Sequence, residues 1–386
     1  MKLNRYISDQ VRIVLILLLL SGFAQELFGQ LSGTYRIVGY VMGSKGKDFS
    51  TINANKLTHI NYAFASIING EIAFRFRNPD HEARLKQNLK KLTDLKKVNP
   101  DLKILVSVGG WGNCAGFSDA ALTPETRSIF AQSGVKFLAE YGFDGIDLDW
   151  EYPGQIGGNE KFRPEDKENF TLMLKALHDE LSKTGANYLL TIASGADEEY
   201  FKWTNLGDAQ KYLDFINIMA YDFYSGLSTI SGHHANLKKT GFPGADNISA
   251  EIAVDRHIKA GVPAEKLVVG VPFYGRYWRG VPETNHGLYK QGTTTGSYKV
   301  YSDIFNNYLN KNTFTRYWDQ SAVAPYLYSK DSAMVISYED PESLTLKTKY
   351  VKEHHLGGIM FWEYYGDSSG SLLGTIYEQF KIEVEK

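Results

Sequence analysis

Cysteine is almost absent from this chain. Cys114 is the single cysteine among 386 residues, which excludes an intramolecular disulfide, a CxxC redox pair and a zinc site built from cysteines. An excess of charge of one sign is also absent, because 44 acidic residues nearly balance 42 basic ones and leave a formal net charge of −2. Such a chain has no strong electrostatic attraction to nucleic acid or to anionic membranes. We therefore expect a neutral partner.

A hydrophobic run long enough for a stable membrane span is lacking as well. The N-terminal apolar run covers residues 13–20, whereas a helix needs about 20 apolar residues to cross a bilayer. Lys2, Arg5 and Arg12 precede the run and small residues follow it, which is the order typical of a secretory signal. We expect residues 1–29 to be a signal peptide and the mature protein to be secreted or periplasmic.

What the chain does contain is typical of one large globular protein. Hydrophobic residues make up 43% of it and charged residues 22%, and a chain of this length can bury a large core without metals or disulfides. It has 52 aromatic residues, of which 25 are Tyr. Aromatic rings in such numbers suit stacking on sugars, although a large core also uses many of them.

Eight short runs of β-branched or apolar residues alternate with helical patterns along the chain. Their starts are spaced by about 46 residues on average, which favours a (β/α)8 TIM barrel over a doubly wound open sheet. The predicted strands cover residues 36–41, 57–65, 103–108, 145–150, 188–194, 215–220, 267–272 and 357–362. The predicted helices cover residues 80–97, 124–141, 164–183, 198–212, 249–261 and 341–355.

The interval between the seventh and eighth predicted strands is too long for one loop and one helix. Its part from residue 276 to 335 is rich in aromatic residues and contains short strand-like pieces, which predicts a small α+β subdomain inserted between strand 7 and helix 7. The expected organisation is therefore a barrel formed by residues 33–275 and 336–386, with an insertion of residues 276–335.

The fourth predicted strand carries the strongest chemical signal. Because side chains alternate along a strand, Asp147, Asp149 and Glu151 should share one face, inside the barrel. Burying three carboxylates in a row costs several kcal/mol unless they share protons or meet cations. At least one inner aspartate should therefore be protonated, and the outermost carboxyl, Glu151, should act as an acid near neutral pH.

Two other interpretations of these carboxyls stay open at this level. Carboxylates bind magnesium or calcium, but ligands spaced by about 6.6 Å on one strand do not converge on one ion without help from other strands. The same spacing falls in the range of inverting glycosidases, since retaining enzymes with a protein nucleophile need about 5 to 5.5 Å. We expect neither a metal nor a cofactor.

The run from Asp144 to Glu151 resembles the DxxDxDxE signature of glycoside hydrolase family 18, the chitinase family, on the fourth barrel strand. The resemblance covers about 350 of the 386 residues. It includes four further segments, which are Ser107-Val-Gly-Gly-Trp111, Met219-Ala-Tyr-Asp-Phe223, Tyr274-Gly-Arg276 and Gly357-Gly-Ile-Met-Phe-Trp-Glu363.

The resemblance implies hydrolysis of β-1,4 bonds between N-acetylglucosamine units. Glu151 would protonate the leaving oxygen, and Asp149 would orient the acetamido group of the substrate, whose carbonyl oxygen attacks the anomeric carbon. Asp147 would share a proton with Asp149, and Tyr221 would hydrogen-bond to the acetamido group. Retention of configuration is likewise implied by the family, which is a substrate-assisted exception among glycosidases.

The resemblance also implies a set of substrate-binding residues at the ends of the strands. Among them, Asp222 would contact the sugar, and Trp362 would form the floor on which the distorted sugar stacks. The full set is Asp144, Trp111, Met219, Asp222, Tyr274, Arg276 and Trp362.

Two alternative functions remain. The family often has a Trp shortly after the segment that ends at Phe223, and this chain does not, which leaves open an endo-β-N-acetylglucosaminidase acting on the chitobiose core of N-glycans. The alternative of another class is a non-catalytic chitin-binding lectin, although such lectins typically lack the acid that Glu151 supplies. We expect His233 and His234 to be surface or cleft residues and Cys114 to be inert.

Overall fold

The computed structural model describes residues 35–43, 47–158, 161–242, 245 and 247–381. The predicted signal peptide, residues 1–29, lies outside the described residues. The compact unit described below begins at Arg36.

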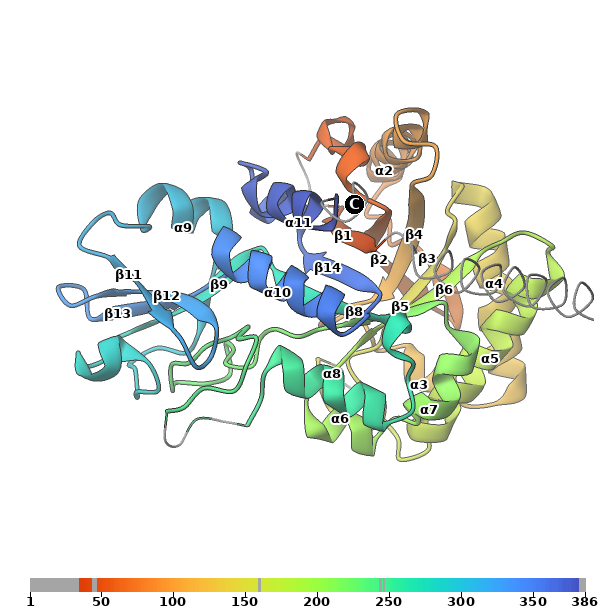
Figure 1. Cartoon of the computed structure of the whole chain (residues 1–386). Coiled ribbons are helices and arrows are strands. Elements are labelled where there is room, and N and C mark those ends of the chain that lie inside the picture. Colours follow the sequence, from red (N-terminus) through yellow and green to blue (C-terminus); the bar gives the residue numbers. More distant parts are fainter. Residues whose placement is uncertain (1–34, 44–46, 159–160, 243–244, 246, 382–386) are drawn as a thin grey trace, which may run out of the picture. The chain divides into compact units, whose positions relative to one another are not determined.

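Eight parallel strands close into a barrel, as predicted (Figure 1). The barrel is closed because the first strand, β1, pairs in parallel with both β2 and β14. A short strand, β3 (Glu71–Ala73), extends β2 as an antiparallel hairpin. The barrel strands are β1 (Arg36–Met42), β2 (His59–Ile68), β4 (Lys103–Gly109), β5 (Gly145–Asp149), β6 (Leu189–Ser194), β7 (Phe215–Ile218), β8 (Leu267–Pro272) and β14 (Gly358–Trp362).

Helices surround these strands, and several begin at clear sequence signals. Thr123 and Asp340 each form a capping box, and a proline follows each of them at the start of α4 and α10, where its missing N–H costs nothing. The longer helices are α2 (Pro79–Thr93), α4 (Pro124–Tyr141), α5 (Asp166–Lys183), α8 (Ala250–Lys259), α10 (Pro341–Glu353) and α11 (Ser371–Lys381).

One predicted helix is divided in the structure, and one helix was missed. The helix predicted over residues 198–212 is divided into α6 (Glu198–Lys202) and α7 (Leu206–Ala209), because the chain turns between them and the Thr204 hydroxyl bonds back to the Tyr200 carbonyl. Helix α11 was not predicted. The remaining short elements are α3 (Phe117–Ala120) and the 3-10 turns η1 (Phe49–Thr51), η2 (Ala54–Lys56), η3 (Asp94–Lys97), η4 (Gln210–Tyr212), η5 (Ala264–Lys266), η6 (Thr284–Gly287) and η7 (Tyr364–Gly366).

The predicted insertion contains a five-stranded antiparallel sheet in the order β10-β9-β13-β12-β11. Its strands start at Tyr274 and end at Ser337, so the sheet extends two residues beyond the predicted limits on each side. At the first limit, β9 follows β8 almost directly. Its elements are β9 (Tyr274–Arg279), β10 (Ser297–Val300), α9 (Tyr301–Asn307), β11 (Thr315–Asp319), β12 (Ala324–Ser329) and β13 (Met334–Ser337).

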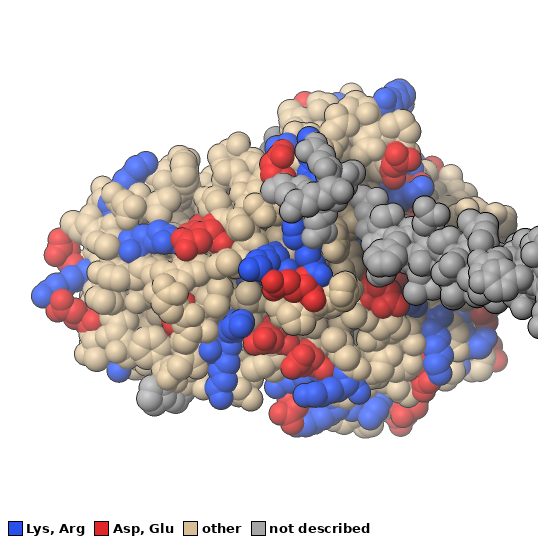
Figure 2. All heavy atoms as spheres, viewed as in Figure 1, with Lys and Arg blue, Asp and Glu red and all other residues tan. Residues whose placement is uncertain are grey.

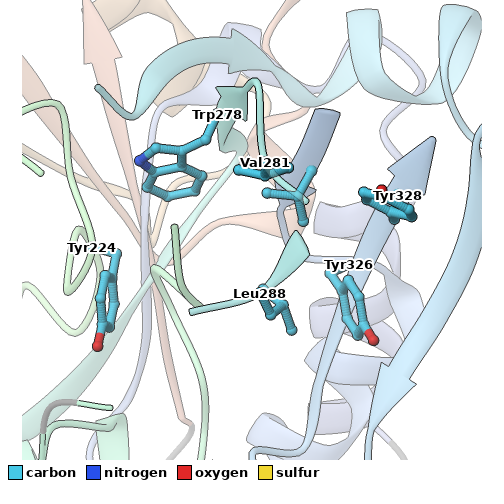
Figure 3. Close-up of a cluster of buried hydrophobic side chains, with 7 residues drawn as sticks. Tyr224, Trp278, Val281, Leu288, Tyr326 and Tyr328 are labelled. Carbon is cyan, nitrogen blue, oxygen red and sulfur yellow. The ribbon is translucent and has the colours of Figure 1, made fainter. Parts of the chain in front are cut away.

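The insertion has its own hydrophobic core, which also holds a residue from the barrel loops (Figure 3). Trp278 of β9 and Val335 of β13 are fully buried there, and Tyr224, from the segment after β7, packs in the same cluster. Burial of rings of this size contributes several kcal/mol. The segment after β7 is therefore attached to the insertion as well as to the barrel.

The surface agrees with the nearly neutral composition. Figure 2 shows acidic and basic side chains interspersed over the visible face. Among the helices that the structure describes, none is both long and apolar enough to span a bilayer.

Candidate active site

Three carboxyls line up along β5 and its C-terminal end. The side chains of Asp147, Asp149 and Glu151 are almost entirely buried, with 0%, 4% and 8% of their residue surface exposed. The alternate residue Trp150 faces the helices instead, where its ring stacks on Phe117 with centroids 5.1 Å apart. The two-residue period of the strand thus separates the carboxyls from the apolar side chains.

The innermost carboxyl, Asp147, is held by four side-chain donors from four other strands of the barrel. Its Oδ2 accepts hydrogen bonds from the Tyr40 and Ser107 hydroxyls at 2.7 and 2.8 Å, and its Oδ1 accepts from Thr191 at 2.6 Å and Asn217 at 3.2 Å. Burial raises the pKa of Asp147, and these hydrogen bonds oppose the rise. Asp147 is thus fixed by four donors, and the sharing of a proton between Asp147 and Asp149 stays a prediction.

Asp149 and Glu151 have the environment of protonated acids. Burial raises the pKa of Asp149 well above its usual value, and the charges of Glu151 and Asp147 raise it further. Its Oδ1 is buried without a hydrogen-bond partner among the described residues. Burial also raises the pKa of Glu151 to about 7, with a contribution from Asp222, although hydrogen bonds to Tyr152 and to the backbone N–H of Trp111 lower it.

Asp222, just after β7, forms a two-point ion pair with Arg276 of β9. The Nε and Nη2 atoms of the guanidinium lie 2.8 Å from the two carboxylate oxygens. Burial alone would raise the pKa of Asp222, but the nearby His234 and the hydrogen bonds and charge of Arg276 outweigh burial and hold the pKa below its usual value. Asp222 is therefore an anion beside the acid Glu151.

Aromatic and sulfur-containing side chains form an apolar surface beside the carboxyls. The Trp362 ring, at the end of β14, stacks on Phe64 with centroids 5.5 Å apart and an interplanar angle of 16°. Met219 and Tyr221 pack against the same cluster, and the Tyr221 hydroxyl lies 4.0 Å from the Met360 sulfur. A ring surface next to buried acids suits a sugar, which presents C–H groups to the rings and hydroxyls to the acids.

Two further predicted binding residues, Trp111 and Tyr274, differ in exposure. Trp111, after β4, leaves 59% of its surface exposed, while Tyr274 is buried and stacks on Tyr298 of β10 with centroids 4.7 Å apart. The Tyr274 ring also lies edge-on to Tyr221 at 6.3 Å. These contacts connect the insertion to Tyr221 of the apolar surface.

Asp144 does not belong to this site, and its predicted role in binding substrate is wrong. It precedes β5 at the N-terminal end of the strand. Its carboxylate accepts a hydrogen bond from the Ile104 N–H at 2.7 Å and pairs with Lys96 at 2.6 Å. Asp144 therefore joins the start of β5 to the start of β4, at the end of the barrel opposite the active site.

Several site residues were not predicted. They are Tyr40, Phe64, Tyr152, Thr191 and Asn217, which the barrel closure and the strand register bring to the carboxyls. The sequence offers one signal for such residues, which is a polar residue inside an apolar strand, such as Asn217 in β7. A buried polar side chain needs a hydrogen-bond partner and so points to a polar site.

His233 and His234 also need correction. Both are fully buried, whereas the sequence suggested surface or cleft positions. Cys114 is buried too, and its sulfur lies 3.1 Å from the Asp149 carbonyl oxygen. Burial raises the pKa of this thiol, so it remains protonated.

Over the described ranges, no three His, Cys, Asp or Glu residues lie close enough to hold a metal ion.

A buried acid of raised pKa, a neighbouring carboxyl and an aromatic floor at the C-terminal face of a barrel define the site of a glycosidase. Comparison with known proteins gives the family. Residues 36–367 match the glycosyl hydrolases family 18, and the chain belongs to this family.

Similar proteins agree with this assignment. Chitinase A1 of Niallia circulans is 39% identical over 423 aligned positions, which cover 93% of this chain and 60% of that protein. A family 18 N-acetylglucosaminidase from Paenibacillus barengoltzii is 41% identical with a TM-score of 0.80, covering 89% of this chain and 99% of that one. A chitinase from Bacillus thuringiensis is 35% identical with a TM-score of 0.84, covering 90% and 70%.

Proposed function

We propose that this protein is a chitinase that hydrolyses β-1,4 bonds between N-acetylglucosamine units of chitin or chito-oligosaccharides. The observation that carries the proposal is the buried pair Asp149 and Glu151, in which burial raises the pKa of Glu151 to about 7. The names of its relatives, Chitinase A1 among them, support the substrate class.

Glu151 acts as the general acid in this proposal. It gives its proton to the glycosidic oxygen while the acetamido carbonyl oxygen of the substrate attacks the anomeric carbon, so that the bond to the leaving sugar breaks and a cyclic oxazolinium ion forms. A water molecule then attacks the anomeric carbon and opens the oxazolinium ring, while the Glu151 carboxylate takes a proton from this water. The two attacks occur on opposite faces, so the product retains its configuration.

Asp149 orients the acetamido group. Its buried Oδ1, which has no partner among the described residues, is placed to accept a hydrogen bond from the acetamido N–H, because a buried polar atom gains most from a partner. Tyr221 lies in the same cluster as Trp362 and would hydrogen-bond to the acetamido oxygen. Asp147 would hold β5 in place through its four donors.

Other residues would bind the sugar units. Trp362 would form the floor of the central subsite. Trp111 would stack on a neighbouring unit, since its ring is exposed. The further proposed contacts come from Met219, Asp222, Tyr274 and Arg276.

A product time course tests the proposal. Incubation with N-acetylchitohexaose should release shorter β-anomeric oligomers, observed by NMR of fresh product, whereas a biantennary glycoprotein should stay intact. Release of N-glycans instead would support the endo-β-N-acetylglucosaminidase alternative. Binding of the hexamer without cleavage would support the lectin alternative.

The acetamido nucleophile gives a second test. Fully deacetylated chitosan and cellulose oligomers should not be cleaved, because they lack the attacking oxygen, and a thiazoline analogue of the cyclic intermediate should inhibit. An initial α-anomer, or cleavage of the deacetylated polymer at a similar rate, would contradict the mechanism.

We also propose that the protein is secreted or periplasmic. Cleavage of the predicted signal would make the mature chain begin between about residues 25 and 31. N-terminal sequencing of protein from the native host is the measurement. Met1 retained on a soluble cytoplasmic protein would contradict this proposal.

A further inference from the structure

His234 is a fully buried residue that contacts the active site from the long segment between β7 and α8. Its Nδ1 lies 3.5 Å from the Asp222 Oδ1, which is longer than the usual N–H···O hydrogen bond. Neither ring nitrogen has a hydrogen-bond partner among the described residues, so the Asp222 carboxylate is the acceptor nearest to Nδ1. Its ring also packs on Tyr274, with centroids 5.3 Å apart. The mechanism described above gives this imidazole no part.

The backbone of His234 is fixed from three directions. Its N–H donates to the Ser337 hydroxyl of β13 at 3.0 Å, and its carbonyl accepts from the Phe223 N–H at 3.1 Å, directly next to Asp222. The following carbonyl, that of Ala235, accepts a hydrogen bond from the buried Lys347 ammonium of α10. A side chain on such a backbone has little freedom to move away from its neighbours.

Asp222 needs support of this kind. Its φ angle is 59°, in the left-handed region that residues with a Cβ rarely occupy, and such a conformation persists only where the surroundings over-determine it. Arg276 binds both carboxylate oxygens, and His234 approaches Oδ1. The carboxylate is thus held by a cation and a ring that both lie on well-fixed backbone.

The charge state of His234 follows from its surroundings. Burial lowers its pKa most strongly, and the cations Arg276 and Lys347 lower it further, although Asp222 opposes them. The imidazole is therefore neutral at neutral pH and carries one N–H, which the Asp222 carboxylate can accept at Nδ1. A neutral donor fixes the carboxylate without cancelling its charge.

We propose that His234 is a positioning residue for the hydrolysis, which together with Arg276 holds the Asp222 carboxylate in place near Glu151. The inference rests on the proposed function of Glu151 as the acid. A fixed negative charge close to the acid favours its protonated form, so His234 would extend activity toward higher pH by acting through Asp222.

Other charged and titratable groups also face these residues and define what must be held constant in a test. Those near Glu151 are Asp149, Tyr152, Tyr221 and Asp222. Those near Asp222 and His234 are Tyr274, Arg276 and Lys347. None of them is altered by the substitutions below except Asp222 itself.

The test is the pH profile of kcat on a chito-oligosaccharide for two variants of one position. His234→Leu removes the N–H, and the fall in activity at high pH should then begin about 0.5 to 1 pH unit lower than in the wild type, with a larger effect on kcat than on KM. His234→Asn places an amide N–H near the position of Nδ1 and should restore the wild-type profile.

Two further variants make the test specific. His233→Asn changes the neighbouring buried histidine, which pairs with Asp319 instead, and should leave the high-pH limb in place. Asp222→Asn should itself move the high-pH fall in activity to lower pH. Adding His234→Leu to Asp222→Asn should cause no further shift, because His234 acts through Asp222. Thermal melts of all variants confirm that each protein is folded.

The inference fails if His234→Leu, folded and active, keeps the wild-type profile, or if His233→Asn shifts the profile by the same amount. It also fails if the His234→Leu shift persists in full in the Asp222→Asn background. A wild-type protein that cleaves no chito-oligosaccharide would instead refute the proposed function, so the two failures are distinguishable.

Discussion

At the scale of single residues, the proposed chemistry depends most on Glu151. Replacing it by Gln keeps the shape of the side chain but removes the transferable proton, so kcat on chito-oligosaccharides should fall roughly 10²- to 10⁴-fold. The measurement is steady-state hydrolysis by purified protein, with circular dichroism to show that the fold is kept. Near wild-type turnover in a folded variant would exclude Glu151 as the acid.

The raised pKa of Glu151 also has a consequence for stability. A carboxyl whose folded pKa lies near 7, above the usual 4.5, favours folding at low pH, and this contribution is lost as the pH rises from about 4.5 through 7. Ionisation of Glu151 at pH 8.5 should then lower the free energy of unfolding by up to about 3 kcal/mol. Glu151→Gln would remove this loss, because Gln does not ionise.

Denaturant unfolding at two pH values measures this effect. The free energy of unfolding of Glu151→Gln should exceed that of the wild type at pH 8.5 by more than at pH 4.5. The exposed glutamate Glu71 offers a matched control, and Glu71→Gln should show no such difference between the two pH values. Equal effects of Glu151→Gln at both values would mean that the carboxyl is not held in its acid form by burial.

The sequence predicted those site residues that a single strand determines. Asp147 and Asp149 share a face because side chains alternate along β5, and this needs no knowledge of other strands. Thr191 reaches Asp147 only because β6 pairs with β5 in the register that places these two residues side by side. Asp144 was misassigned because it belongs to the same motif but precedes the strand, so that it lies at the wrong end of the barrel.

At the scale of elements, helix α10 is connected to the active-site segment by a buried ion pair. Lys347 pairs with Glu339 and also donates to the Ala235 carbonyl, and both charged side chains are 1% exposed. Lys347→Met would leave the Glu339 carboxylate buried without its cation, which typically costs about 3 to 5 kcal/mol.

Chemical denaturation measures this loss. Replacing both partners, with Lys347→Met and Glu339→Leu, should destabilise the protein less than Lys347→Met alone, because no unpaired charge remains. The exposed pair of α10, Lys349 and Glu353, provides the control, and Lys349→Met should cost less than about 1 kcal/mol. A small loss for Lys347→Met would show that Glu339 is protonated without its partner.

Element prediction succeeded where local signals are strong. The barrel strands are short apolar runs, and α10 begins at Asp340 and Pro341, which together cap a helix in any context. The order of the insertion strands was not predictable in the same way, because β13 pairs with β9 from far along the chain. Val335 of β13 lies opposite Trp278 of β9, so this pairing depends on the packing of the two side chains in the core of the insertion.

At the scale of the whole molecule, the insertion and the barrel build the active site together. Arg276 comes from β9 of the insertion and binds Asp222 from the end of β7. The segment that carries His233 is bound to Asp319 of β11. Deleting the insertion would therefore disturb the acid site as well as any extended binding surface, so a single surface residue is a sharper test of chain binding than a deletion.

Tyr298 is the residue best placed for that test. It lies opposite Arg276 in the pairing of β10 with β9, its ring stacks on Tyr274, and 44% of its surface is exposed. An exposed ring next to the site can stack on a sugar unit that only a longer chain provides. Tyr298→Ala should therefore lower kcat/KM on N-acetylchitohexaose at least several-fold more than on an aryl chitobioside.

Phe305 of α9 gives the matched control, because it is an aromatic residue of the same insertion with 42% of its surface exposed. Phe305→Ala should change kcat/KM on the two substrates equally, since its ring packs on Tyr301 and not on Tyr274. If Tyr298→Ala lowers activity on both substrates by the same factor, its ring supports Tyr274 and Arg276 and does not bind the chain. If the loss of kcat/KM caused by Tyr298→Ala instead grows with oligomer length, the insertion binds the polymer, because an added sugar unit raises kcat/KM only where the protein contacts it.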